Sequence, residues 1–220
     1  MGWRSLRYNL IGGQNTAIGV GALESTDSAT GNTAIGRGAM IGSIGNTTNL
    51  GYNTVMGYYA GALMDSTEYV TAIGMQAGYN NRGRENTFMG TLSGYGASGT
   101  DLTGIENTGL GAYTLVYNNT GMSNTAAGLG ALFANRTGNG NVGIGTRALA
   151  NAATYSYNIA IGDSAMYGNN ANENMAIGTF AMRFNNTGTQ NSAVGNYALQ
   201  NSNTGSFNVA VGHQSLVNSN

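Results

Sequence analysis

The sequence contains no cysteine, no proline and no lysine, and only 8% of its 220 residues are charged. Without cysteine there is no disulfide framework and no thiolate chemistry. Eight arginines stand against nine acidic residues, which gives a formal net charge of −1. The basic surface that is typical of nucleic-acid-binding proteins is therefore missing, and nucleic acid is not an expected partner.

Long apolar runs are missing as well. No stretch is long enough to cross a bilayer, and residues Met1 to Asn9 lack the apolar segment of a secretion signal. We therefore expect neither membrane insertion nor a signal peptide in this chain.

Glycine and asparagine, in contrast, are abundant, with 37 and 31 residues respectively. Scattered through a polar chain, they would predict disorder. Hydrophobic residues nevertheless make up 41% of the sequence, and they recur at fixed positions. This pattern predicts a chain that buries a long and thin core.

One short motif recurs along almost the whole chain. It reads Asn15-Thr16-Ala17-Ile18-Gly19, and successive copies are 16, 17 or 21 residues apart. The motif glycines are Gly19, Gly36, Gly57, Gly74, Gly90, Gly111, Gly128, Gly145, Gly162, Gly178, Gly195 and Gly212. A second motif, Ala-Leu or Ala-Met, begins three residues after most of these glycines, as in Ala22-Leu23.

A period of 17 residues with two short apolar stretches is too short for two helices but fits two strands and two turns. We predict an all-β fold, a parallel β-roll or β-solenoid of about twelve 17-residue coils with glycines at its corners. The array covers residues 15–216. Residues 1–14 are expected to be a lead-in segment or cap, and residues 217–220 a tail or a junction to a further module.

The columns of the repeat predict which side chains face inward. The large aliphatic residues before the motif glycines, such as Ile18, Ile73 and Ile161, are expected to fill the interior. The threonine column that begins at Thr16 shares their face by alternation, so we expect it to point inward rather than to form an ice-binding surface.

The residue between these two columns is small and is expected on the opposite face. Its apolar character favours a subunit interface, and an ordinary exposed column is the alternative. The predicted interface residues are Ala17, Ala34, Ala72, Ala126, Ala160, Ala176, Ala193 and Ala210.

The Asn-Thr-Ala-Ile-Gly spacing with the following Ala-Leu pair resembles the head repeats of YadA-like trimeric autotransporter adhesins, and similar arrays occur in bacteriophage tail fibres. The resemblance covers residues 15–216. It implies a left-handed parallel β-roll, a homotrimer and a structural and host-binding role. The period here is longer than in those adhesin heads, and neither a coiled-coil stalk nor a membrane barrel is present in the sequence.

These absences favour a bacteriophage tail fibre segment, which would place the chain in the virion with other tail proteins as partners. The alternative is the head domain of a bacterial adhesin, located on the cell surface. In either setting a host-surface glycan or protein is the expected receptor.

The two positions after each motif glycine vary freely, which is typical of an exposed ridge. Aromatic side chains there are suited to stacking on sugar rings, and arginines to binding hydroxyls. Packing of these rings against the corner or between subunits is the alternative. The candidate ridge residues are Arg37, Tyr58, Tyr59, Tyr113, Arg147, Phe180 and Tyr197.

Insertions in the two 21-residue steps, at Ile41 to Tyr52 and Tyr95 to Glu106, are further candidates. His213 has no acidic neighbour in sequence, and the acidic residues occupy non-equivalent repeat positions. We therefore expect no catalytic residue, no metal ligand, no cofactor and no enzymatic activity.

Overall fold

The structure is a computed structural model that describes residues 2–42, 50–96, 102–201 and 204–218. Over these residues the chain is a parallel β-solenoid of about eleven turns, with strands and turns but no helix. This confirms the predicted all-β solenoid. The chain divides into two compact units, Met1–Tyr113 and Thr114–Asn220.

Each unit contains six strands of three residues, one for each copy of the motif. In the first unit they are β1 (Thr16–Ile18), β2 (Thr33–Ile35), β3 (Thr54–Met56), β4 (Thr71–Ile73), β5 (Thr87–Met89) and β6 (Thr108–Leu110). In the second unit they are β7 (Thr125–Ala127), β8 (Val142–Ile144), β9 (Ile159–Ile161), β11 (Met175–Ile177), β13 (Ser192–Val194) and β14 (Val209–Val211). The second unit also contains a two-residue pair, β10 (Gly168–Asn169) and β12 (Phe184–Asn185).

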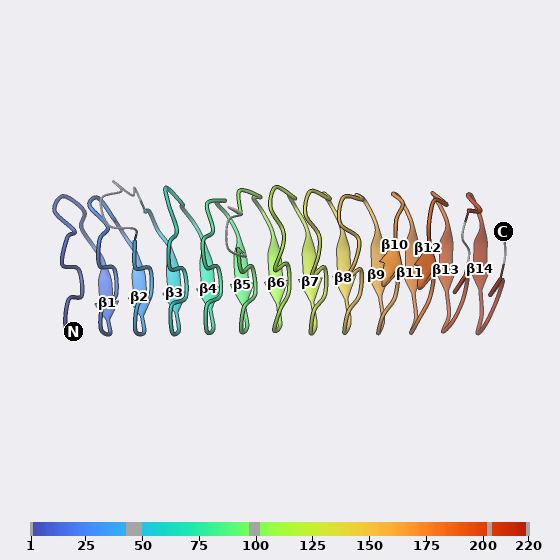
Figure 1. The fold of residues 1–220 in the computed structure, drawn as a ribbon, viewed down its shortest axis with the longest axis horizontal. Coiled ribbons are helices and arrows are strands. Elements are labelled where there is room, and N and C mark those ends of the chain that lie inside the picture. Colours follow the sequence, from blue (N-terminus) through green and yellow to red (C-terminus); the bar gives the residue numbers. More distant parts are fainter. Residues whose placement is uncertain (1, 43–49, 97–101, 202–203, 219–220) are drawn as a thin grey trace. The chain divides into compact units, whose positions relative to one another are not determined.

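Neighbouring coils pair in parallel with equivalent motif positions opposite one another. Ala17 of β1 lies opposite Ala34 of β2, and Ala176 of β11 lies opposite both Ala160 and Ala193. Figure 1 shows the coils of each unit side by side, with the motif strands aligned from one coil to the next. A side chain therefore meets its own equivalent in the next coil, at the spacing of about 4.8 Å that parallel strands impose.

The middle residue of each three-residue strand points into the coil. Ala160 and Ala176 are completely buried, and Phe88 is 1% exposed. The prediction that the alanine column is a trimer interface is therefore wrong, because these side chains never reach the surface. The correction applies to Ala17, Ala34, Ala72, Ala126, Ala160, Ala176, Ala193 and Ala210.

The first and third residues of the same strands point outward. Ile18 is 50% exposed, Ile144 40% and Ile177 36%. The prediction that the aliphatic column fills the interior is therefore wrong. The threonine column also faces outward, so the inward direction predicted for it is wrong for the same reason.

The second motif supplies the large side chains of the core. Its Leu or Met, four residues after the motif glycine, is buried in most coils, as at Leu23, Leu132 and Met166. Because these side chains already fill the narrow interior, the strand opposite them has room only for alanine or glycine in most coils. This is the physical reason why the smaller column lies inside.

The same Leu and Met residues adopt a backbone conformation that L-residues usually avoid. The φ angle is 52° at Leu23, 50° at Leu132 and 49° at Met166. A left-handed conformation costs roughly 1–2 kcal/mol for a residue with a Cβ. Full burial of such a side chain contributes about 1.5–3 kcal/mol, so burial offsets the strain.

The motif glycines form the corner after each strand. At Gly162 the φ angle is 133°, and an added Cβ would lie 2.5 Å from the carbonyl oxygen of Gly178 in the next coil. Every other residue would clash there with the backbone of its neighbour. The prediction of corner glycines is confirmed.

Buried asparagines connect the coils at the position before each strand. The Asn141 side-chain oxygen accepts from the backbone N–H of Asn158 at 3.0 Å, and Asn158 accepts from Asn174 in the same way at 3.0 Å. These bonds satisfy backbone groups that would otherwise be buried without a partner.

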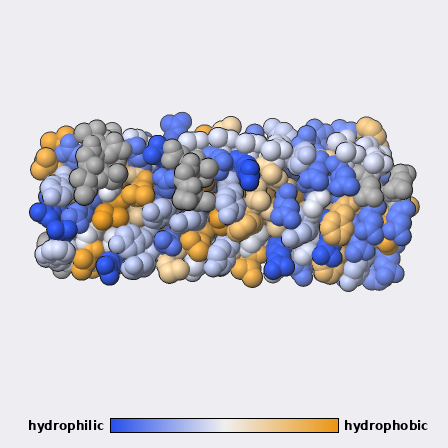
Figure 2. Space-filling model, viewed as in Figure 1, coloured by the Kyte–Doolittle hydropathy of each residue, from blue (hydrophilic) through white to orange (hydrophobic). Residues whose placement is uncertain are grey.

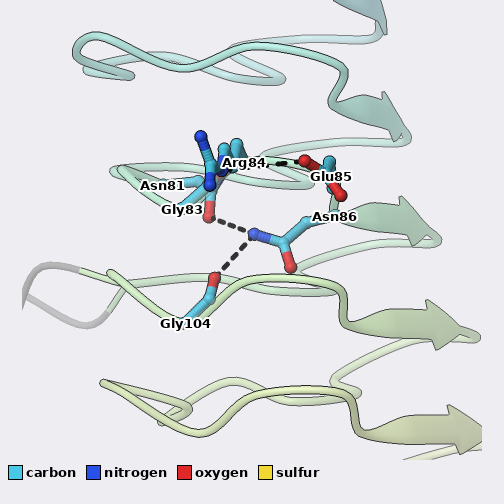
Figure 3. A network of polar contacts seen from close by, with 6 residues as sticks. All are labelled: Asn81, Gly83, Arg84, Glu85, Asn86 and Gly104. Atoms are coloured by element: carbon cyan, nitrogen blue, oxygen red, sulfur yellow. Dashed lines mark hydrogen bonds and ion pairs between the residues drawn. The ribbon is translucent and has the colours of Figure 1, made fainter.

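The side-chain amide of the same asparagines donates to backbone further round the coil. In the first unit Asn86 donates to the carbonyl of Gly104 at 2.8 Å and to the side-chain oxygen of Asn81 at 3.2 Å (Figure 3). Arg84 and Glu85 beside them form an ion pair at 3.6 Å. Asparagine therefore holds both the neighbouring coil and its own turn in place.

Residues 2–14 continue the repeat before the first strand. Gly2 lies against the backbone of Gly19, and the N–H of Leu6 donates to the carbonyl of Ala22 at 3.0 Å. The buried Glu24 carboxylate lies 3.7 Å from Arg4 and 3.9 Å from Arg7. The lead-in segment is thus packed on the first coil as a coil of its own.

The two insertions proposed as functional loops lie partly outside the described residues, at 43–49 and 97–101.

Candidate functional surfaces

The outward side of the three-residue strands forms a regular surface in each unit. None of its outward side chains is charged, because the first and third residues of these strands are Thr, Ser, Ala, Met, Val, Ile or Leu. We call it the outer face, defined by the first and third residues of these strands. Exposed apolar surface free of charge is typical of an interface.

The two units differ in the composition of this outer face. In the first unit all six strands begin with threonine, so a threonine row runs beside an aliphatic row. In the second unit the first row is mostly apolar, and Val142, Ile159 and Met175 stand beside Ile144, Ile161 and Ile177. The space-filling view shows hydrophobic side chains at the surface of both units among hydrophilic ones (Figure 2).

The candidate ridge residues of the first unit lie outside the core, as predicted. The Arg37 guanidinium is 6.0 Å from the centre of the Tyr58 ring, and Tyr58 meets Tyr59 edge-on at 4.6 Å. Tyr58 is 49% exposed and Tyr113, three coils further along the sequence, is 43% exposed. The structure therefore brings Arg37, Tyr58 and Tyr59 together but not Tyr113.

Sequence reasoning missed a second aromatic pair in this unit. The rings of Tyr79 and Tyr95 stack at 5.1 Å. Burial, followed by the neighbouring hydroxyl groups of Tyr95 and Tyr59, raises the pKa of the Tyr79 phenol. Tyr79 and Tyr95 each lie five residues after a motif glycine, and this shared repeat position is the sequence signal that would have predicted the pair.

In the second unit, Phe180 and Tyr197 occupy equivalent positions in adjacent coils and their ring centres are 5.4 Å apart. The His213 ring meets Tyr197 edge-on at 5.9 Å, which extends the row by one coil. Arg147 is exposed two coils before Phe180. In this unit the rings of Phe180, Tyr197 and His213 therefore form a row, and Arg147 lies apart from it.

Arg183 was not singled out from the sequence, yet three aromatic rings surround its guanidinium. Its guanidinium carbon is 4.8 Å from the Phe180 ring centre, 4.9 Å from Phe184 and 5.9 Å from Tyr167. Together with Tyr197 these residues form what we call the Arg183 cluster. An arginine over ring faces gains cation–π attraction, which fixes its side chain.

No group of three or more His, Asp or Glu side chains suited to a metal ion occurs within the described ranges. The same ranges hold no helix with the length and hydropathy needed to span a bilayer.

Comparison with protein-family models, curated proteins and solved structures finds no match for this chain.

Proposed function

We propose that this chain is a structural and host-binding fibre protein without enzymatic activity, a bacteriophage tail fibre segment that acts as a trimeric shaft and adhesin. The proposal is supported by the solenoid architecture and by the resemblance of the repeat to fibre and adhesin heads. The head domain of a bacterial trimeric adhesin is the alternative setting, with the same surfaces in the same roles.

The observation that carries the proposal is the uncharged outer face. Exposing an uncharged row such as Ile144, Ile161 and Ile177 to water is unfavourable for a monomer, because contiguous apolar surface is stabilised by burial. Self-association buries those rows, and a threefold arrangement allows the same narrow face of each chain to meet at one axis. The proposed trimer interface is therefore the outer face and not the alanine column.

Host binding is assigned to the aromatic ridge, since the core, the corners and the outer face already have other roles. Exposed aromatic rings with nearby arginines suit a glycan receptor, because ring faces stack on sugars and guanidinium groups bind their oxygens. The Arg37, Tyr58 and Tyr59 group and the Phe180 and Tyr197 row are the two candidates.

Light scattering on the purified chain tests the assembly. We expect the mass of three chains, and a stable monomer at micromolar concentration would contradict the trimer. The triple variant Tyr58→Ala, Tyr59→Ala, Tyr113→Ala tests recognition. It is expected to remain trimeric and to adsorb less to cells of the bacterial host, whereas unchanged adsorption would leave the first unit with a spacer role.

The threonine row supports a second candidate function, the binding of ice. Six threonines in the first unit point outward at regular strand spacing, beside an aliphatic row of equal regularity. This function requires the outer face to remain free, so it excludes the trimer. An ice recrystallisation assay separates the two, because only a monomeric chain with this face exposed is expected to inhibit crystal growth.

A further inference from the structure

The Arg183 cluster combines a cation with several ring faces on one side of the second unit. Phe184 is 40% exposed, and Tyr167, Phe180 and Arg183 are each partly exposed. The cluster is thus a surface feature and not a part of the core.

A short second ladder holds this cluster in place. The pair β10 and β12 sets Gly168 opposite Phe184, and the N–H of Gly168 donates to the carbonyl of Arg183 at 2.9 Å. Behind them the buried Asn185 donates to the side chain of Asn169 at 3.1 Å. Such a ladder fixes the backbone beneath the rings and lowers the entropy lost when a ligand binds.

Glycine at position 168 allows the Phe184 ring to lie close to the chain. A Cβ added at Gly168 would stand 3.2 Å from Cδ1 of the Phe184 ring, so a larger residue would push the ring away. The position of the Phe184 ring therefore depends on the residue at position 168 in the preceding coil.

The charge of Arg183 is not compensated within the described residues. Arg4 and Arg7 lie beside Glu24, and Arg84 beside Glu85, but Arg183 forms no ion pair there. Its Nε is buried and lacks a hydrogen-bond partner, whereas the residue as a whole is partly exposed. A fixed cation with accessible donors is a site that an anionic group completes.

We infer that the Arg183 cluster binds an acidic glycan, with the sugar rings stacked on Phe180, Phe184 and Tyr197 and a carboxylate on the Arg183 guanidinium. Aromatic faces suit the C–H faces of sugars, and the planar guanidinium binds a carboxylate through two parallel hydrogen bonds. The inference rests on the proposed host-binding function and specifies the chemical class of the receptor.

A pair of matched ligands tests the inference. One is a hexuronic acid oligosaccharide and the other is the same oligosaccharide with its carboxyl groups reduced to alcohols, each titrated calorimetrically against the intact chain. We expect the acidic form to bind about tenfold more tightly, since a hydrogen bond to a charged group is the stronger one. Equal affinities, or no binding of the acidic form, would overturn the inference.

Variants locate the effect. Arg183→Gln is expected to remove the preference for the acidic oligosaccharide while leaving the oligomeric mass unchanged, and Phe180→Ala to weaken both ligands. Arg136→Gln, which removes another exposed arginine of the same unit, is the control that keeps the preference. If Arg183→Gln retains the preference, the site is wrong. If Arg183→Gln loses the preference for the acidic oligosaccharide but adsorption to host cells is unchanged, the Arg183 cluster binds acidic glycans and host adsorption depends on another site.

Discussion

Phe88 and Gly94 lie opposite each other in the core of one coil, and their sizes are the reverse of those in most other coils. Phe88 occupies the column that holds alanine in most other coils, and Gly94 occupies the column of Leu23 and Leu132. A Cβ added at Gly94 would lie 2.5 Å from Cε1 of the Phe88 ring. The large side chain therefore comes from the strand in this coil and from the opposite turn in most of the others.

This exchange predicts a rescue between two substitutions. Gly94→Leu alone is expected to prevent folding of this coil, because the added side chain overlaps the Phe88 ring, and Phe88→Ala alone should cost about 3–5 kcal/mol through the cavity it leaves. The double variant restores the Ala and Leu pair of the other coils. Its free energy of unfolding in urea should therefore exceed that of either single variant.

Additive losses in the double variant would contradict the exchange. Gly94 has a φ of 59°, close to the 52° of Leu115 at the equivalent position, so the backbone itself does not forbid leucine there. Any failure of the rescue would then have to come from packing with the neighbouring coils.

The motif glycines give a second prediction. Gly162→Ala should destabilise the chain by about 3 kcal/mol or more. The φ of 133° at this position is nearly restricted to glycine, and the new Cβ would clash with the carbonyl group of Gly178. Gly13→Ala is the matched control, since nothing lies within 4 Å of a Cβ at that position. Thermal unfolding should separate the two variants clearly, and equal melting temperatures would refute the corner role.

The sequence predicted the repeat, the corner glycines and the grouping of threonine with the aliphatic column. It failed on which of the two faces lies inside. Larger and more hydrophobic residues such as Ile161 were placed in the core on burial energy alone, but a coil this narrow is already filled by Leu149 and Met166. The signal was present in the Ala-Leu motif, whose leucine recurs as regularly as the isoleucine.

The role of the asparagine column was not predicted. Asn141 and Asn158 are buried, and the side-chain oxygen of Asn141 accepts a hydrogen bond from the backbone N–H of Asn158 in the next coil. The Arg183 cluster could not be predicted, because it depends on the contacts of Tyr167 and Phe184 from adjacent coils at positions that vary in the other repeats.

The asparagine ladder yields a third prediction. Asn158→Ala leaves the backbone N–H of Asn174 buried without its 3.0 Å acceptor, which should cost about 1–3 kcal/mol. Asn151→Ala, at an exposed asparagine of the preceding coil, should change the free energy of unfolding by less than about 0.5 kcal/mol. Hydrogen exchange at the Asn174 amide reports the loss directly, and protection equal to that of the unaltered chain would contradict the ladder.

The fourth prediction contrasts two neighbours on one strand, Ala160 and Ile161. Ala160→Asp places a charge without a partner in the filled interior, so a loss of about 4 kcal/mol or more is expected, and the coil should unfold. Ile161→Asp places the same charge on the outer face, where water reaches it in the separated chain. There the β-sheet circular dichroism should persist while light scattering shows the assembly dissociated into monomers. If Ile161→Asp unfolds the chain and Ala160→Asp does not, the assignment of the inner and outer faces is wrong. If the Ile161→Asp variant folds and remains a trimer, the outer face is not the trimer interface.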